Sequence, residues 1–142
     1  MNVLIVEKDP LVRDQIKVGL RQFPEEFTVL SGEGYAGIHL LRQHTIDLLI
    51  LGVPRNSAEA KRRIDYVREV SPTVDLVVVA TDSCAKELSG EKGRLDIFSF
   101  LARPVGAMDF FRLIRRVRER LHEGATGTVP TGGARSGAMP TT

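Results

Sequence analysis

The sequence predicts an α/β domain with a doubly wound, five-stranded parallel sheet and helices on both of its faces. Five short apolar segments alternate along the chain with segments in which apolar residues recur at helical spacing. Most of the apolar segments are continuous, as expected of parallel strands that are buried on both faces. The 142 residues are enough for one such domain with a proper core.

The first half of the chain is expected to hold three strands and two helices. The strands are Val3–Val6, Phe27–Leu30 and Leu48–Leu51. Asp9 and Pro10 open the first helix as its N-cap and first-turn residues. This helix ends near Pro24 and takes its apolar face from Val12, Ile16, Leu20 and Phe23. A short second helix carries Tyr35, Ile38 and Leu41.

The second half is expected to hold two more strands and three helices. The strands are Leu76–Ala80 and Phe98–Leu101. The helix before them has a stripe of Ile64, Val67 and Val70 and is closed by Ser71-Pro72. A weaker helix over Ala85–Leu95 is interrupted by Gly90 and Gly93. The last helix is strongly amphipathic, with Phe110, Leu113, Ile114, Val117 and Leu121. Four strands are hydrophobic enough to be interior, which leaves Phe27–Leu30 for an edge.

Composition sets limits on the class of protein. The net charge of +2 is too small to indicate nucleic-acid binding by itself. The only cysteine, Cys84, cannot form an internal disulfide, suits a reducing compartment and is expected to be half-buried near a helix start. The apolar run Val3–Val6 is too short for a signal peptide or a membrane span, so a cytoplasmic protein is expected. Residues 1–122 are expected to form the domain, and 123–142 a flexible tail or linker rich in Gly, Thr and Pro.

A parallel sheet binds ligands at the carboxyl ends of its strands, so the candidate site can be located before its chemistry is known. Four segments follow the ends of strands one, three, four and five. They are Glu7-Lys8-Asp9, Gly52-Val53-Pro54, Thr81-Asp82-Ser83 and Arg103-Pro104.

Over residues 1–122 the chain resembles the receiver domain of two-component response regulators. In that family the first strand ends in an acidic pair, the third in the phosphoacceptor aspartate, the fourth in Thr or Ser, and the fifth in Lys-Pro. The stretch from Val3 to Arg13 is the most specific match, and Thr81, Arg103-Pro104 and Ser71-Pro72 fall at the family's usual offsets. The resemblance implies a flavodoxin-like receiver topology and a role in bacterial-type signal transduction.

The matching positions lack what phosphorylation of this family requires. The acceptor position is Gly52, which has no side chain, so no aspartyl phosphate can form there. Glu7 and Lys8 occupy the acidic pair, so one magnesium ligand is replaced by a cation. At about 4 Å and an effective dielectric of about 20, that cation would repel a divalent ion by about 8 kcal/mol. Arg103 replaces the family's lysine, and only Thr81 matches the usual switch residue.

No other acidic residue is expected to serve as the acceptor. Asp47 lies at the opposite end of the third strand, about 16 Å away. Asp9 and Asp82 could face the site but are expected to cap the first and fourth helices. Two interpretations stay open for Lys8 and Arg103. They either join the nearby acidic side chains in an ion-pair network that fills the metal site, or they point into solvent.

A partner surface is expected on the last strand and the last helix, which the family commonly uses for dimers or partners. Phe100 matches an aromatic residue that switches between buried and exposed states, with an ordinary core phenylalanine as the alternative. The last helix carries Arg112, Arg115, Arg116, Arg118 and Arg120. These arginines form either a basic patch for an acidic partner or a solvated polar face, and Lys61-Arg62-Arg63 is interpreted in the same way. Nucleic acid is not the expected partner, because no aromatic residues are interleaved with the arginines.

The leading hypothesis is therefore a non-enzymatic, phosphorylation-independent receiver domain that binds a protein partner or a second copy of itself. It is expected to need no cofactor and no metal; His39, His44 and His122 are too scattered for a metal site. The alternative is a sensor that holds a small molecule or anion in the crevice near Gly52, Lys8 and Arg103. A receiver with an unanticipated acceptor is disfavoured. So is an enzyme of the same fold, because no phosphate loop or nucleophile elbow follows any strand.

Overall fold

Strands and helices alternate along the chain, as the apolar pattern predicts. The computed structural model describes residues 1–23 and 27–127. The strands are β1 (Asn2–Val6), β2 (Thr28–Gly32), β3 (Leu48–Gly52), β4 (Asp75–Ala80) and β5 (Ile97–Ala102). The helices are α1 (Pro10–Leu20), α2 (Gly34–His39), α3 (Ser57–Val70), α4 (Asp82–Leu88) and α5 (Ala107–Gly127), with short 3₁₀ turns η1 (Leu40–Arg42) and η2 (Ser89–Glu91).

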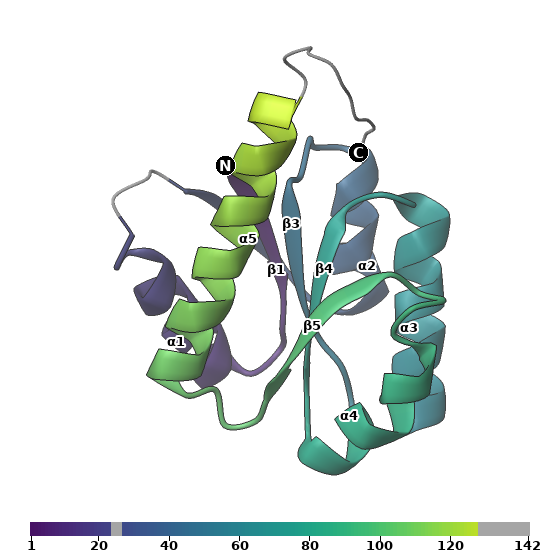
Figure 1. Ribbon diagram of the computed structural model, residues 1–142. Coiled ribbons are helices and arrows are strands. Elements are labelled where there is room, and N and C mark those ends of the chain that lie inside the picture. Colours follow the sequence, from purple (N-terminus) through teal and green to yellow (C-terminus); the bar gives the residue numbers. More distant parts are fainter. Residues whose placement is uncertain (24–26, 128–142) are drawn as a thin grey trace. The chain divides into compact units, whose positions relative to one another are not determined.

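The five strands form one parallel sheet in the order β2-β1-β3-β4-β5, which confirms the predicted fold class (Figure 1). This order places β5 at an edge, so the expectation that four strands are interior is wrong. The segment Phe98–Leu101 is apolar enough to suggest an interior strand, but Phe98, Ser99 and Phe100 are only half-buried. An open sheet has two edges, and this one has β2 and β5 at them.

The core lies on both faces of the sheet because the side chains of a strand alternate between the faces. Residues 1–110 form one compact unit that contains the whole sheet and α1–α4. On one face, α2, α3 and α4 cover the strands (Figure 1). That side buries Leu4, Leu49, Leu76 and Val78 with Ile64 and Val67 of α3. On the other side of the sheet lies α1, which buries Val12, Ile16 and Leu20.

Three helix ends differ from the prediction. Helix α1 ends at Leu20 rather than near Pro24, so Phe23 is buried outside the helix. The helix expected over Ala85–Leu95 begins earlier, at Asp82, and stops at Leu88 before η2. The early stop is consistent with Gly90 and Gly93, since glycine weakens a helix interior.

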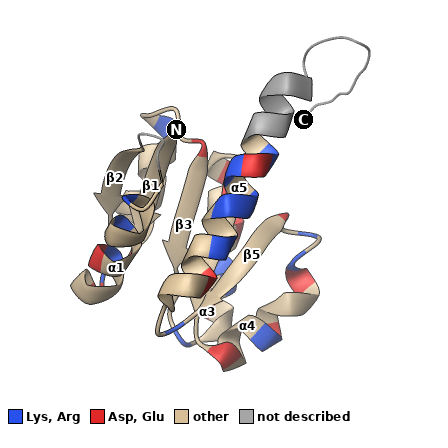
Figure 2. Ribbon diagram, turned by 60° about the vertical axis from the view of Figure 1, so that its left-hand side comes forward, with Lys and Arg blue, Asp and Glu red and all other residues tan. Residues whose placement is uncertain are grey.

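Helix α5 lies mostly in a second unit, which starts at Phe111. Its apolar residues recur at helical spacing, and Figure 2 shows bands of basic residues along it. Arg112, Arg115 and Arg116 are exposed. The helix runs to Gly127, and the rest of the expected tail, 128–142, lies outside the described residues. Among the helices described, none is both long enough and apolar enough to cross a membrane.

Candidate functional site

The candidate site lies at the carboxyl ends of β1, β3 and β5, where the register of the sheet brings three loops together. Val6 pairs with Leu51, so Glu7 and Gly52 follow on neighbouring strands. The Val53 amide donates to the Val79 carbonyl at 3.0 Å, and the Arg103 amide donates to the Ala80 carbonyl at 3.0 Å. Backbone hydrogen bonds therefore hold the first residues of these loops at the carboxyl end of the sheet.

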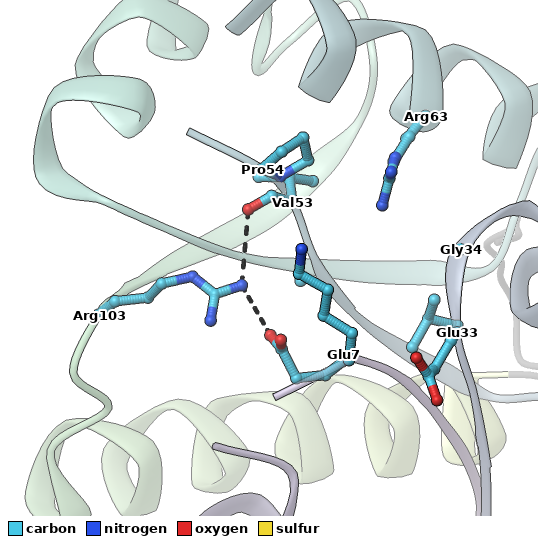
Figure 3. Close-up of a pocket in the computed structure, with 10 residues that line it drawn as sticks. Glu7, Glu33, Gly34, Val53, Pro54, Arg63 and Arg103 are labelled. Atoms are coloured by element: carbon cyan, nitrogen blue, oxygen red, sulfur yellow. Dashed lines mark hydrogen bonds and ion pairs between the residues drawn. The ribbon is translucent and has the colours of Figure 1, made fainter. Parts of the chain in front are cut away.

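An ion pair between Glu7 and Arg103 occupies the centre of the site (Figure 3). Arg103 Nη2 lies 2.7 Å from Glu7 Oε1 and also donates to the Val53 carbonyl at 3.5 Å. The second oxygen, Glu7 Oε2, accepts a hydrogen bond of 3.0 Å from the Asp9 amide. Glu7 is 4% exposed and is the one buried charged residue of the part of the chain that the structure describes. A buried carboxylate needs such partners, because an unpaired charge is costly to bury.

Gly52 is packed so closely that its missing side chain leaves no empty space. A Cβ built on Gly52 would overlap Glu7 Oε1, and it would lie 2.7 Å from Glu7 Cδ and 2.8 Å from Arg103 Nη2. The φ angle of Gly52 lies outside the left-handed region, so the backbone itself does not require glycine. The ion pair therefore occupies the volume that a side chain at position 52 would need.

Lys8 stays outside this pair. Its side chain is exposed, and with the residues that the structure describes it makes no hydrogen bond or ion pair. The ion-pair interpretation therefore holds for Arg103 and Glu7, and the solvent interpretation holds for Lys8. Among the described residues, neither the Asp9 carboxylate nor the Asp82 carboxylate joins this pair.

The two acidic residues weighed as substitute acceptors have different positions. Asp9 caps α1 as predicted, with its carboxylate accepting from the Leu11 amide at 3.0 Å. Asp82 does not cap α4, because Thr81 takes that role and accepts from the Cys84 amide at 3.2 Å. Threonine caps helices by the same chemistry, and Asp82 becomes the exposed first residue of the helix. The prediction for Asp82 is wrong by one residue.

Two further residues singled out in the sequence are explained by packing. Cys84 is fully buried rather than half-buried, and its burial raises the pKa of its thiol. Phe100 is half-buried and packs against the core cluster on the face of α2–α4. That contact is what the core interpretation of Phe100 expects, while a change between two states stays a prediction.

A cavity of about 280 Å³ opens beside the ion pair (Figure 3). It takes in Glu7, Lys8, Gly52 and Arg103, so the structure brings together four of the five residues expected at the degenerate site. Thr81 is the exception. The cavity also reaches Glu33 and Gly34 before and in α2, and Arg63 on α3.

Arg63 was missed as a site residue because the run Lys61-Arg62-Arg63 looks like a solvated helix face. The spacing carries the only sequence signal: Arg63 lies three residues after Ala60 and four before Val67, so it shares a helix face with apolar residues. In the structure Arg63 Nε donates to Glu59 at 3.1 Å, and the guanidinium lies 5.5 Å from the centre of the Tyr35 ring. Hydrogen bonds from Arg63, Arg62 and Tyr35 lower the pKa of Glu59 from 4.5 to about 2.

Comparisons with known proteins place this arrangement among receiver folds. No protein-family model matches the chain, and comparison with the sequences of curated proteins gives no match. Among solved structures, the chain is similar to the REC domain of AraT, a response regulator from Geobacillus stearothermophilus. The TM-score is 0.70 at 20% identity, over 86% of this chain and 95% of that one.

Two further receiver domains give the same result. The CheY-like receiver domain protein from Methanospirillum hungatei JF-1 has a TM-score of 0.69 at 18% identity, over 87% and 98% of the two chains. The isolated REC domain of RcsB from Salmonella enterica serovar Typhimurium has a TM-score of 0.69 at 21% identity, over 84% and 88%. The chain therefore has the flavodoxin-like fold of receiver domains.

Proposed function

We propose that this chain is a receiver-fold module that acts through a protein partner and works without being phosphorylated. One observation carries the proposal: where β3 ends, position 52 has no side chain and the Glu7–Arg103 pair fills the space beside it. Transfer of a phosphoryl group to a protein carboxylate needs a nucleophilic oxygen in line with the donor. The substitute candidates do not supply one, since Asp9 is held in a helix cap and Asp47 accepts from the Asn2 amide at the other end of the sheet.

The residues at this site do not fit the Mg²⁺ that the fold family implies. Mg²⁺ prefers several oxygen ligands in near-octahedral geometry. Here Glu7 offers a single carboxylate, and both of its oxygens already accept hydrogen bonds. Lys8 adds a positive charge at the neighbouring position. Among the described residues, no group of three or more His, Cys, Asp or Glu side chains could hold a metal ion.

Arg103 supplies a fixed positive charge where the family would use an exchangeable one. A guanidinium stays protonated at all physiological pH values, so the charge does not depend on the concentration of a metal. The pair neutralises the buried charge of Glu7 at the carboxyl end of the sheet. We therefore expect the loops there to keep one conformation, which a partner recognises without a phosphorylation signal.

The test is exposure of the purified chain to acetyl phosphate with Mg²⁺, and separately to Mg²⁺ with BeF₃⁻. Intact mass spectrometry should show no phosphorylated chain, and amide NMR spectra should show no saturable change at Glu7, Lys8 or Gly52. The RcsB receiver domain, whose structure was determined in the presence of BeF₃⁻, is the positive control for the reagent. An acyl phosphate on this chain, or saturable Mg²⁺–BeF₃⁻ shifts at those residues, would overturn the proposal.

The partner surface is proposed on α5, where Arg112, Arg115 and Arg116 are exposed. Their charge suits an acidic protein surface, and a second copy of the chain is the alternative partner. Arg115→Glu with Arg118→Glu should abolish capture of the partner, while Lys92→Glu on η2's end should not. Light scattering of the same variants separates self-association from binding of a different protein. If the α5 double variant captured the partner as well as the Lys92→Glu control does, α5 would not be the partner surface.

A further inference from the structure

The cavity beside the Glu7–Arg103 pair has the donors of an anion site. We propose that it binds a small phosphate-bearing molecule non-covalently, held mainly between Lys8 and Arg63. Such a site goes beyond an interaction module, because it gives the domain a chemical signal that could be sensed without phosphorylation. Figure 3 shows Arg63 reaching from α3 toward this space, while Arg103 enters it from the opposite side.

Unused hydrogen-bond donors face the cavity. Lys8 has all three ammonium protons available, since it bonds to none of the residues described. Arg63 uses only its Nε toward Glu59, so Nη1 and Nη2 stay unbonded within the described chain. A guanidinium edge and an ammonium are the groups that proteins use to hold phosphate oxygens, the first in bidentate geometry and the second as a point charge.

The charges around the cavity favour an anion with more than one negative charge. Lys8, Arg63 and Arg103 line it, against Glu7 and Glu33. Glu7 is already neutralised by Arg103. Glu59 sits behind Arg63 but is shared with Arg62, so that cluster of two arginines and one glutamate has a net charge of +1. Before Glu33 is counted, two positive charges remain, one on Lys8 and one on this cluster. A phosphate group, which carries about −1.5 to −2 at pH 7, matches them better than a carboxylate does, and Glu33 brings the total at the cavity to +1.

The shape of the cavity limits the ligand to a small one. Its volume of about 280 Å³ is near the lower end of the range of about 300–1,000 Å³ for small-molecule sites. Val53, Pro54 and Gly34 give it uncharged walls beside the cations. Glu33 is exposed on its lining and opposes an anion, so it should reduce the affinity. Thr81 does not line this space, which therefore differs from a site in which a phosphoryl group would be transferred to the end of β3.

The experiment titrates the full chain separately with inorganic phosphate, phenyl phosphate and acetate in the presence of EDTA. Binding is measured by calorimetry and by amide NMR. Phosphate or phenyl phosphate should shift the amides of Lys8, Gly34 and Arg63 in a saturable way, and acetate should bind at least about tenfold more weakly. Tighter binding of phenyl phosphate than of inorganic phosphate identifies a monoester as the ligand class, and the reverse order identifies the free ion.

Matched variants distinguish the site from general charge attraction. Lys8→Ala and Arg63→Gln should each weaken phosphate binding by about tenfold, the loss expected for one charged hydrogen bond. Lys92→Ala is the control that should leave binding unchanged. Arg62→Gln is the charge-matched control: it removes the same charge from the Glu59 cluster but no donor that lines the cavity, so it should weaken binding less than Arg63→Gln does. Glu33→Gln should tighten binding.

The proposed site would be overturned if the control variants weakened phosphate binding as much as Lys8→Ala and Arg63→Gln do. It would also be overturned if neither phosphate compound gave a saturable amide shift. Neither result bears on the proposed independence from phosphorylation, which the acetyl phosphate experiment tests separately. Conversely, an acyl phosphate formed in that experiment would overturn the proposed function and leave the titration in EDTA unaffected.

Discussion

The clearest test of the packing at position 52 is the substitution Gly52→Ala. Alanine adds one Cβ, which would overlap Glu7 Oε1 and lie 2.7 Å from Glu7 Cδ and 2.8 Å from Arg103 Nη2. Because the backbone angles of Gly52 suit any residue, the strand itself does not oppose alanine. The added methyl group must therefore push back the Glu7 carboxylate, the Arg103 guanidinium, or both.

Two opposing contributions set the size of the effect. Alanine in a strand interior is more favourable than glycine by about 0.5–1 kcal/mol. Overpacking a filled site costs about 1–3 kcal/mol. If the methyl group separates Glu7 from Arg103, a buried carboxylate loses its partner, at a cost of about 3–5 kcal/mol. We expect a net loss of about 2 kcal/mol, in which Glu7 shifts and its bond to Arg103 lengthens without breaking.

The measurement is urea unfolding of the wild type and of Gly52→Ala, with Gly90→Ala as the matched control. A Cβ at Gly90 meets no atom within 4 Å, so that variant should keep or slightly raise the stability. A second experiment introduces Gly52→Ala into a Glu7→Ala background. Because residues 52 and 7 are in contact, the loss in the free energy of unfolding caused by Gly52→Ala should be smaller there by at least about 1 kcal/mol. The packing argument would be refuted if Gly52→Ala were as stable as the wild type. It would also be refuted if Gly52→Ala lowered the free energy of unfolding equally in the wild-type and in the Glu7→Ala background.

Two further predictions concern the framework around the site. Arg68 donates to five backbone carbonyls that precede β4 and β5, including those of Val74 and Asp96 at 2.8 Å each. Because Arg68→Met leaves these carbonyls without a donor, it should lower the free energy of unfolding in urea by about 3 kcal/mol or more. Arg68→Lys should not rescue it, because one ammonium cannot reach both loops. Glu59 has a folded pKa of about 2, below its ordinary 4.5, so its stabilising effect is present above pH 4.5 and is lost as the pH falls toward 2. The melting temperature of Glu59→Gln should therefore fall less than that of the wild type between pH 5 and pH 2.5, and parallel curves would contradict the assignment.

Most of the fold could be predicted from the sequence because the strands are unusually apolar. Leu48–Leu51 and Leu76–Ala80 are fully buried, and runs of that kind occur where helices cover both faces of a parallel sheet. The edge position of β5 could not be predicted from the apolar pattern alone. Ile97 and Leu101 are buried although β5 has a neighbouring strand, β4, on one side only. Nothing in the apolar composition of a strand states whether a second strand lies beside it.

The location of the site was predictable, but its internal bonding was not. Strand ends specify which residues meet, since parallel strands place their carboxyl ends at one edge. Which cation pairs with Glu7 depends on loop paths and rotamers. Arg103 follows β5, three strands away from β1, and still reaches the Glu7 carboxylate, while Lys8, next to Glu7 in the chain, is exposed. Lys8 follows Glu7 at a bend beyond the end of β1.

The pairing of Glu7 with Arg103 also decides what kind of signal this edge of the sheet could receive. A metal site responds to the concentration of the metal, and a phosphoryl acceptor responds to a donor. An internal guanidinium responds to neither, because its charge is permanent and its position is fixed by hydrogen bonds to Glu7 and Val53. On the proposed function, reversible signals would therefore come from outside the pair. Among the cations at this cavity, Lys8 and the outer nitrogens of Arg63 have no partner in the part of the chain that the structure describes, so a ligand there would be their first exchangeable partner.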